Sequence, residues 1–194
     1  NDGSRLYVIG QINPEISEFA LPTPFSLSSV VATGNILNMG GVRDQIGRNM
    51  VFGKDGKRFY FLGRFNSKVY QYDLTIAYDI TTAVATLEFT PGADAPGPQD
   101  VRFNNDGTRM YLLTEDNLTV EEFALTNPWE ITSASHNSVF YDASVEVVAS
   151  AQAFDFNSDG TKMFIVGSVT NEVYQYSTGN VEAGGGDGGG DGGG

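Results

Sequence analysis

The stretch FNSDGTKMFIVG, residues 156–167, decides the fold because the chain repeats it. Related stretches are NDGSRLYVIG (1–10), FGKDGKRFYFLG (52–63) and FNNDGTRMYLLT (103–114). Their Asp-Gly pairs begin at Asp2, Asp55, Asp106 and Asp159, so successive copies start 53, 51 and 53 residues apart. Self-similarity at a nearly fixed period is the sequence signature of a repeat architecture.

Other positions repeat in step with the Asp-Gly pair. The third residue after each aspartate is a cation: Arg5, Arg58, Arg109 and Lys162. The fifth is aromatic: Tyr7, Tyr60, Tyr111 and Phe164. The seventeenth is aromatic as well: Phe19, Tyr72, Phe123 and Tyr176. In three copies a further aromatic residue stands at the twenty-third place: Phe25, Tyr78 and Trp129.

Each unit has the pattern of short antiparallel strands. Asp-Gly between apolar runs is turn chemistry, because glycine adopts positive φ without a Cβ clash. The run that follows, such as KMFIVG, is almost continuously apolar, which suits a strand covered on both faces. An alternating strand such as SKVYQYDL (67–74), a turn such as NPWEITSA (127–134) and a further strand complete the unit.

About four strands in a repeat of about 52 residues is typical of a β-propeller blade. We therefore expect an all-β, β-propeller-like fold of about four blades of four antiparallel strands. A single repeat domain spans residues 1–180, with units at about 1–50, 51–101, 102–154 and 155–180. A Gly/Asp-rich tail occupies residues 181–194.

The quoted residues also resemble a known family. The pattern F-N-x-D-G-T-[RK]-M-[YF], followed by V-Y-Q-Y and N-P-W-E-I-T, is similar to the YVTN/NHL-type propeller repeats. It most resembles the repeats found in large bacterial surface proteins and phage structural proteins. The resemblance covers roughly residues 1–178. It implies a scaffold and carries no fixed catalytic residues to transfer.

The two end units are expected to be incomplete. The first lacks its innermost strand and the last lacks its outermost strand, which leaves 3, 4, 4 and 3 strands along the chain. Open sheet edges are templates for pairing with other molecules. The pattern therefore favours a homo-oligomer or a larger assembly.

The tail allows two interpretations. Residues 184–194 read GGGDGGGDGGG, which by composition is a flexible linker. The alternative is an assembly element that packs against other chains in a filament, with Asp187 and Asp191 as contacts. Ordering so many glycines would require neighbours, because fixing each backbone costs about 1–2 kcal/mol.

Charge and composition exclude several classes of function. The formal net charge is −13, which disfavours binding to nucleic acid or to anionic membranes. No apolar run is long enough for membrane insertion. The absence of cysteine removes disulfide scaffolds and thiolate chemistry. No signal peptide is visible, and the start at Asn1 is expected to be a processed or cut terminus.

One copy of the repeat could bind a metal ion. Asp155, Asn157 and Asp159 alternate as in the first half of a calcium loop, and Gly160 follows. Val166 stands where such a loop needs a glutamate. A hairpin turn explains the string better, and Ca²⁺ stays a weak alternative. No other cofactor is expected.

Two other features could contact carbohydrate. The aromatic residues Phe25, Tyr78 and Trp129 could stack on sugars once per blade, or could fill the gaps between blades, which is commoner. The tripeptide NLT at 117–119 makes Asn117 a formal glycosylation acceptor.

The leading interpretation is a non-catalytic structural or adhesive repeat protein that is extracellular, on a cell surface or in a virion. We expect no enzyme. The first alternative is a lectin-like or peptide-binding propeller module, and the second is a propeller hydrolase or lyase. An enzyme should show one non-repeated pocket with converging polar groups near the central channel.

Overall fold

The computed structural model describes residues 2–10, 15–39, 47–53, 55–147, 150–169 and 171–178. Its strands form four antiparallel sheets of three, four, four and three strands in chain order. Each sheet is called a unit below. The all-β prediction, with about four blades and incomplete ends, is confirmed.

The units follow one another along the chain. Unit 1 contains β1 (Arg5–Ile9), β2 (Glu15–Ala20) and β3 (Val31–Asn38). Unit 2 contains β4 (Gly47–Phe52), β5 (Arg58–Gly63), β6 (Lys68–Leu74) and β7 (Ala83–Phe89). Unit 3 contains β8 (Pro98–Phe103), β9 (Arg109–Thr114), β10 (Thr119–Leu125) and β11 (Ala134–Asp142). Unit 4 contains β12 (Ala151–Phe156), β13 (Lys162–Gly167) and β14 (Glu172–Ser177).

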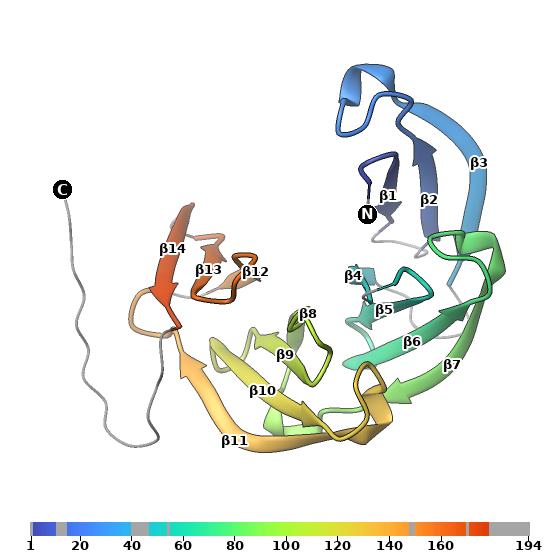
Figure 1. Cartoon of the computed structure of the whole chain (residues 1–194). Helices are drawn as coiled ribbons and strands as arrows, with labels where there is room; N and C mark the ends of the chain where they lie inside the picture. The colour runs from blue at the N-terminus through green and yellow to red at the C-terminus, as the bar shows by residue number, and fades with distance from the viewer. Residues whose placement is uncertain are drawn as a thin grey trace.

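The four units are arranged in an arc (Figure 1). Strands β4, β8 and β12 lie on the inner side of the arc, and β3, β7 and β11 lie on the outer side. Short 3₁₀ turns precede the outer strands, at Leu27–Ser29, Ile80–Thr82 and Ile131–Ser133. Another, Gly92–Asp94, precedes β8. Among the described residues no helix is long and apolar enough to cross a membrane.

The Asp-Gly pairs form turns, as the sequence predicts. In unit 3 the Asp106 carboxylate accepts a hydrogen bond from the Thr108 amide at 2.9 Å, and Gly107 has φ +73°. The same geometry recurs in the other three copies, with the aspartate accepting from Ser4, Lys57 or Thr161. The aspartate therefore fixes the backbone, and glycine provides the positive φ that the turn requires.

The core lies between the units, because each middle sheet is apolar on both faces. Phe59 and Phe61 face unit 1 and pack near Ile16. Their neighbours Tyr60 and Leu62 face unit 3. A third cluster joins units 3 and 4 through residues such as Leu113 and Phe154. Burying each such side chain contributes about 1.5–3 kcal/mol, so a unit gains most of its stability from its neighbours.

The aromatic residues at the twenty-third place lie in a second type of turn, which recurs in units 1, 2 and 3. Phe25, Tyr78 and Trp129 all have positive φ, at 59°, 61° and 66°. Each ring lies directly over the glycine of its own Asp-Gly turn, which is Gly3, Gly56 or Gly107. A side chain at any of these glycines would overlap the ring, so the two turns of a unit depend on each other.

Candidate functional site

Polar side chains gather at one end of the inner strand pairs of units 2 and 3. Gly47 of β4 lies opposite Gly63 of β5, and Pro98 of β8 lies opposite Thr114 of β9. The residues that follow these positions are Arg48 and Arg64 in unit 2 and Gln99 and Glu115 in unit 3. We call these four side chains the central cluster.

The central cluster is built around one carboxylate. The Gln99 side-chain amide donates to Glu115 Oε2, and Arg64 Nη2 lies 3.7 Å from the same oxygen. Burial, and then the nearby charge of Arg64, lower the pKa of Arg48. Arg48 Nε and Gln99 Oε1 are buried and have no hydrogen-bond partner among the described residues. Unsatisfied donors and acceptors of this kind suit a ligand with polar groups of its own.

The members of the central cluster are not repeated from unit to unit. The place of Arg48 in its unit corresponds to Gln99 and Gln152 in the next two. The place of Arg64 corresponds to Glu115 and Ser168. These substitutions change charge and length, whereas the turn and core positions keep their chemistry. The central cluster is therefore a feature of units 2 and 3 and not part of the repeated scaffold.

A buried carboxylate, Asp100, lies beside this cluster on β8. It is 2% exposed and joins three units. Its Oδ1 accepts from Arg102 Nη1 at 2.6 Å, from the Val101 amide at 2.8 Å and from the side-chain amide of Asn49. Its Oδ2 accepts from the Phe154 amide at 3.0 Å. Burial raises the pKa of Asp100 to about 6, although the charge of Arg102 opposes this shift.

The raised pKa of Asp100 predicts a pH dependence of stability. The folded state holds the proton more tightly, so this contribution is complete below pH 3.8 and is lost as the pH rises through about 6. The loss should be about 3 kcal/mol, at about 1.4 kcal/mol per pKa unit. Urea unfolding at stepped pH should show this fall in the wild type and not in Asp100→Asn. Parallel curves for the two proteins would contradict the assignment.

The exposed aspartates of the Asp-Gly turns affect stability in a different pH range. Hydrogen bonds from Ser4, Thr108 and Thr161 lower the pKa of Asp2, Asp106 and Asp159, respectively. Their contribution to stability is present above pH 3.8 and is lost as the pH falls through the lowered pKa. The fall expected from Asp100 lies on the other side of pH 3.8, so the two effects can be separated.

Of the residues proposed for calcium, Asn157 and Asp159 hold the turn of unit 4, and Asp155 on β12 pairs with Arg102 of unit 3. Asp155 Oδ1 accepts from the Phe156 amide, and Asp159 Oδ1 accepts from Thr161. Asn157 Oδ1 accepts from the Lys162 amide at 2.8 Å. In the described part of the chain, no three His, Asp or Glu side chains are grouped so as to hold a metal ion. The Ca²⁺ site stays a prediction.

The other predicted site residues lie apart from the central cluster. Tyr78 and Trp129 are partly buried at contacts between units, whereas Phe25 is 77% exposed. Asn117 is exposed in the loop between β9 and β10, and Thr119 of the same tripeptide is buried. Asp187 and Asp191 lie outside the described residues. The proposals of carbohydrate stacking, glycosylation and tail-mediated assembly remain predictions.

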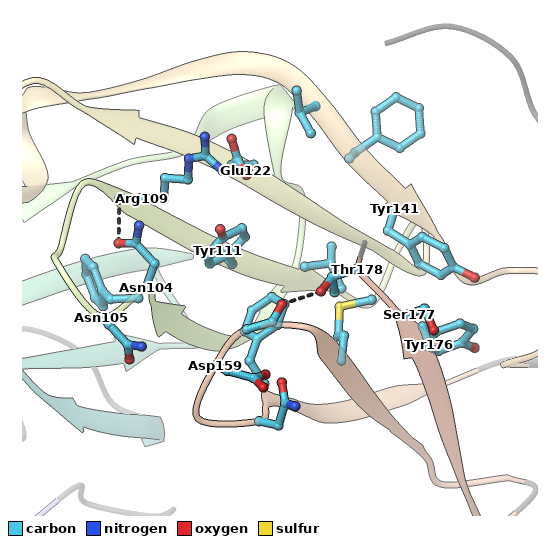
Figure 2. A pocket seen from close by; sticks show the side chains of 18 of the residues that line it. Asn104, Asn105, Arg109, Tyr111, Glu122, Tyr141, Asp159, Tyr176, Ser177 and Thr178 are labelled. Atoms are coloured by element: carbon cyan, nitrogen blue, oxygen red, sulfur yellow. Dashed lines mark hydrogen bonds and ion pairs between the residues drawn. The ribbon is translucent and has the colours of Figure 1, made fainter. Parts of the chain in front are cut away.

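A groove opens between units 3 and 4, with a cavity volume of about 480 Å³. One wall carries Arg109, Tyr111 and Glu122 of β9 and β10, and the other carries Asp159 and the end of β14 (Figure 2). Arg109 Nη1 lies 3.6 Å from Glu122 Oε2. The groove is separate from the central cluster, since none of its lining residues belongs to that cluster.

Comparison with known proteins shows the fold. No family model and no curated protein sequence matches the chain. Among solved structures, a candidate 6-phosphogluconolactonase from Bacteroides uniformis is similar at TM-score 0.63 and 16% identity, over 91% of this chain and 48% of that one. The periplasmic gluconolactonase of Pseudomonas aeruginosa is similar at TM-score 0.57 and 13% identity, over 91% of this chain and 47% of that one. A β-propeller domain from Myceliophteria thermophila is similar at TM-score 0.56 and 9% identity, over 91% of this chain and 50% of that one.

The fold is thus of the β-propeller type, and the chain spans about half the length of these similar structures. Two predictions from the sequence are contradicted. We expected a non-catalytic structural or adhesive protein and no enzyme, whereas several similar structures are named as lactonases. Those names correspond to the second alternative, a propeller hydrolase. The repeated positions of the sequence report only the scaffold that the units share, so they do not distinguish a structural propeller from an enzymatic one.

Sequence reasoning missed the central cluster. Its residues stand at places where the copies of the repeat differ. An alignment of the repeats highlights only the places where the copies agree, so it does not single out these residues. The available signal was that variation itself: Arg48 against Gln99, and Arg64 against Glu115, at the ends of otherwise regular strands.

Proposed function

We propose that this chain is part of a β-propeller hydrolase that opens a lactone, with the central cluster as its substrate site. The observation that carries the proposal is the buried Nε of Arg48, which has no hydrogen-bond partner among the described residues and lies near Arg64 and the Glu115 carboxylate. Cationic donors beside a carboxylate can bind an acyl oxygen and activate water in one place. The names of the similar structures support a sugar-acid lactone as substrate.

In the proposed reaction, water adds to the lactone carbonyl and the ring C–O bond breaks to give a hydroxy acid. Glu115 accepts a proton from the attacking water and then returns it to the ring oxygen, which leaves as a hydroxyl. Arg48 and Arg64 stabilise the negative charge that develops on the carbonyl oxygen. Gln99 holds the Glu115 carboxylate through its side-chain amide.

The test follows acid release from glucono-δ-lactone and from 6-phosphogluconolactone, with spontaneous hydrolysis as the baseline. We expect acceleration of at least one of them. Glu115→Gln should lower kcat about 100-fold, the usual effect of removing a general base. Arg48→Gln should lower kcat/KM about 10-fold or more, because a hydrogen bond to a charged group is lost.

The matched control is Glu88→Gln on outer strand β7, which removes a carboxylate that pairs with Lys68 away from the central cluster. It should leave the rates unchanged. The proposal fails if neither lactone is hydrolysed faster than in buffer, or if all three variants behave alike.

We also propose that the repeat is of the YVTN/NHL type. The recurring Asp-Gly turn and the aromatic turn that lies over it support this assignment.

A further inference from the structure

A row of polar side chains lies on the face of unit 3 that packs against unit 2. In the register of the strands, Glu121 of β10 stands opposite Leu112, and His136 of β11 stands opposite Phe123. Leu112 and Phe123 belong to the core between the two units. The polar row shares their face of the sheet and consists of Thr114, Thr119, Glu121 and His136.

The hydrogen bonds of this row lead to the Glu121 carboxylate. Thr119 Oγ1 donates to Glu121 Oε1 at 2.6 Å, and it lies 2.9 Å from Thr114 Oγ1. Because Thr119 has a single hydroxyl hydrogen, Thr114 is the donor in the second bond. The other carboxylate oxygen, Oε2, lies 3.0 Å from His136 Nε2. Glu121 is buried and accepts on both oxygens, so the proton of this contact is on Nε2 of the imidazole.

The second ring nitrogen of His136 faces a different carboxylate. Nδ1 lies 3.7 Å from Oδ1 of Asp94, which belongs to the 3₁₀ turn Gly92–Asp94. In the part of the chain that the structure describes, Asp94 and Glu121 are the carboxylates within 4 Å of the ring nitrogens. The Phe123 ring packs beside the imidazole, with 5.2 Å between the ring centroids. The imidazole is therefore held between one buried and one exposed acidic side chain.

The contact with Asp94 depends on the charge of His136. With its Nε2 proton donated to Glu121, a neutral imidazole presents a bare lone pair at Nδ1. Two acceptors then face each other, and no hydrogen bond can form between Nδ1 and Asp94. A protonated imidazole carries a hydrogen on both nitrogens, so it can pair with both carboxylates at once. Imidazole side chains change charge between about pH 5 and pH 8.

Asp94 belongs to the linker that joins units 2 and 3. This linker, residues 90–97, runs from outer strand β7 to inner strand β8 (Figure 1). Its inner end is fixed, because the Gly97 carbonyl accepts from the Glu115 amide at 3.0 Å. Ala95 is buried in the core between the units. Asp94 itself is 56% exposed, so its side chain can leave the imidazole for water at little cost.

The repeated scaffold does not require this ionisable pair. In unit 2 the places of Glu121 and His136 are taken by Tyr70 and Ala85. Tyr70 is buried in an apolar cluster there, and Ala85 packs against the same cluster. A unit therefore folds with apolar contacts at these places, whereas unit 3 has two ionisable groups that face the linker.

We propose that His136 is a pH-operated clasp on the linker between units 2 and 3. As an imidazolium, it pairs with Glu121 and Asp94 together and fastens the 3₁₀ turn to β11. As a neutral ring, it keeps its bond to Glu121 and releases Asp94. The turn is therefore fastened towards pH 5 and freed towards pH 8. The clasp does not rest on the proposed hydrolase function, since none of its groups belongs to the central cluster.

Two measurements on the full chain test the clasp. The ring ¹⁵N chemical shifts of His136, the one histidine of the chain, report which nitrogen carries a proton. Nδ1 should be bare at pH 8 and protonated at pH 5, with Nε2 protonated at both. Hydrogen exchange of the amides of residues 92–95, corrected for the intrinsic effect of pH on the exchange rate, reports the turn. Their protection should be about 2- to 5-fold higher at pH 5, as expected for an exposed ion pair.

Substitutions of Asp94 separate the clasp from other effects of pH. Asp94→Ala removes the carboxylate, so protection of the turn should be low at both pH values. Asp94→Asn should show little pH dependence, because an amide can donate to a bare Nδ1 and can accept from a protonated one. The control is Asp100→Asn, which removes a carboxyl whose pKa burial raises to about 6 and leaves the clasp intact. This variant should keep the difference between pH 5 and pH 8.

Three results would overturn the proposal. A proton on Nδ1 at pH 8 would mean that the neutral ring can donate to Asp94, so that charge does not control the contact. Equal protection of the turn at pH 5 and pH 8 in the wild type would mean that the charge of His136 does not act on the linker. A pH difference that persists in Asp94→Ala would assign the effect to another group.

Discussion

Replacing Asp100 with alanine is expected to lower the free energy of unfolding by about 3–5 kcal/mol, the cost of breaking a buried ion pair by removing one partner. Asp100 accepts hydrogen bonds from Arg102, Val101 and Phe154 at 2.6, 2.8 and 3.0 Å. All three donors are left without this acceptor in the variant. The Arg102 charge, with a side chain 23% exposed, loses its closer partner.

The position of Asp100 explains why the effect should be large. Its donors come from units 2, 3 and 4, because Asn49 of β4 also donates to it. Removing the carboxylate loosens two junctions at once, and each unit relies on its neighbours for burial. Urea unfolding at neutral pH measures the change.

Asp155→Ala provides the comparison. Asp155 pairs with the same arginine at 3.3 Å, but its side chain is 71% exposed. An exposed pair contributes about 0–1 kcal/mol, so this variant should remain close to the wild type. Equal losses for Asp100→Ala and Asp155→Ala would show that burial of Asp100 does not decide its contribution.

Replacing Gly107 with alanine is expected to cost about 2–5 kcal/mol of stability. The backbone there has φ +73°, which an L-residue with a Cβ adopts at a cost of about 1–2 kcal/mol. The new Cβ would also lie 2.2 Å from the indole of Trp129, so the ring has to move. Overpacking of this kind costs a further 1–3 kcal/mol, roughly.

Gly160→Ala separates the two costs. Gly160 has the same φ of +73°, and no described atom lies within 4 Å of its Cβ position. It should lose only the backbone term, about 1–2 kcal/mol. Thermal and urea unfolding of the two variants give the difference. A Gly160 variant as unstable as the Gly107 variant would mean that the ring of Trp129 contributes nothing to the cost.

Local sequence determined the architecture of this protein. The Asp-Gly turns, the apolar runs and their spacing depend on neighbouring residues, and the repeat shows each pattern four times. The three strands described in each end unit agree with the same alignment. A local signal averaged over copies is strong enough to predict strands, turns and the stacking of sheets.

The tertiary structure alone decided which side chains meet between units. The Tyr60 hydroxyl and the Trp129 carbonyl are 69 residues apart in the chain, and the sequence showed only that both positions repeat. Arg64 and Glu115, on different units, come together because the ends of neighbouring inner strands converge. Such contacts depend on how sheets pack, and packing geometry is not encoded in the spacing of residues along one strand.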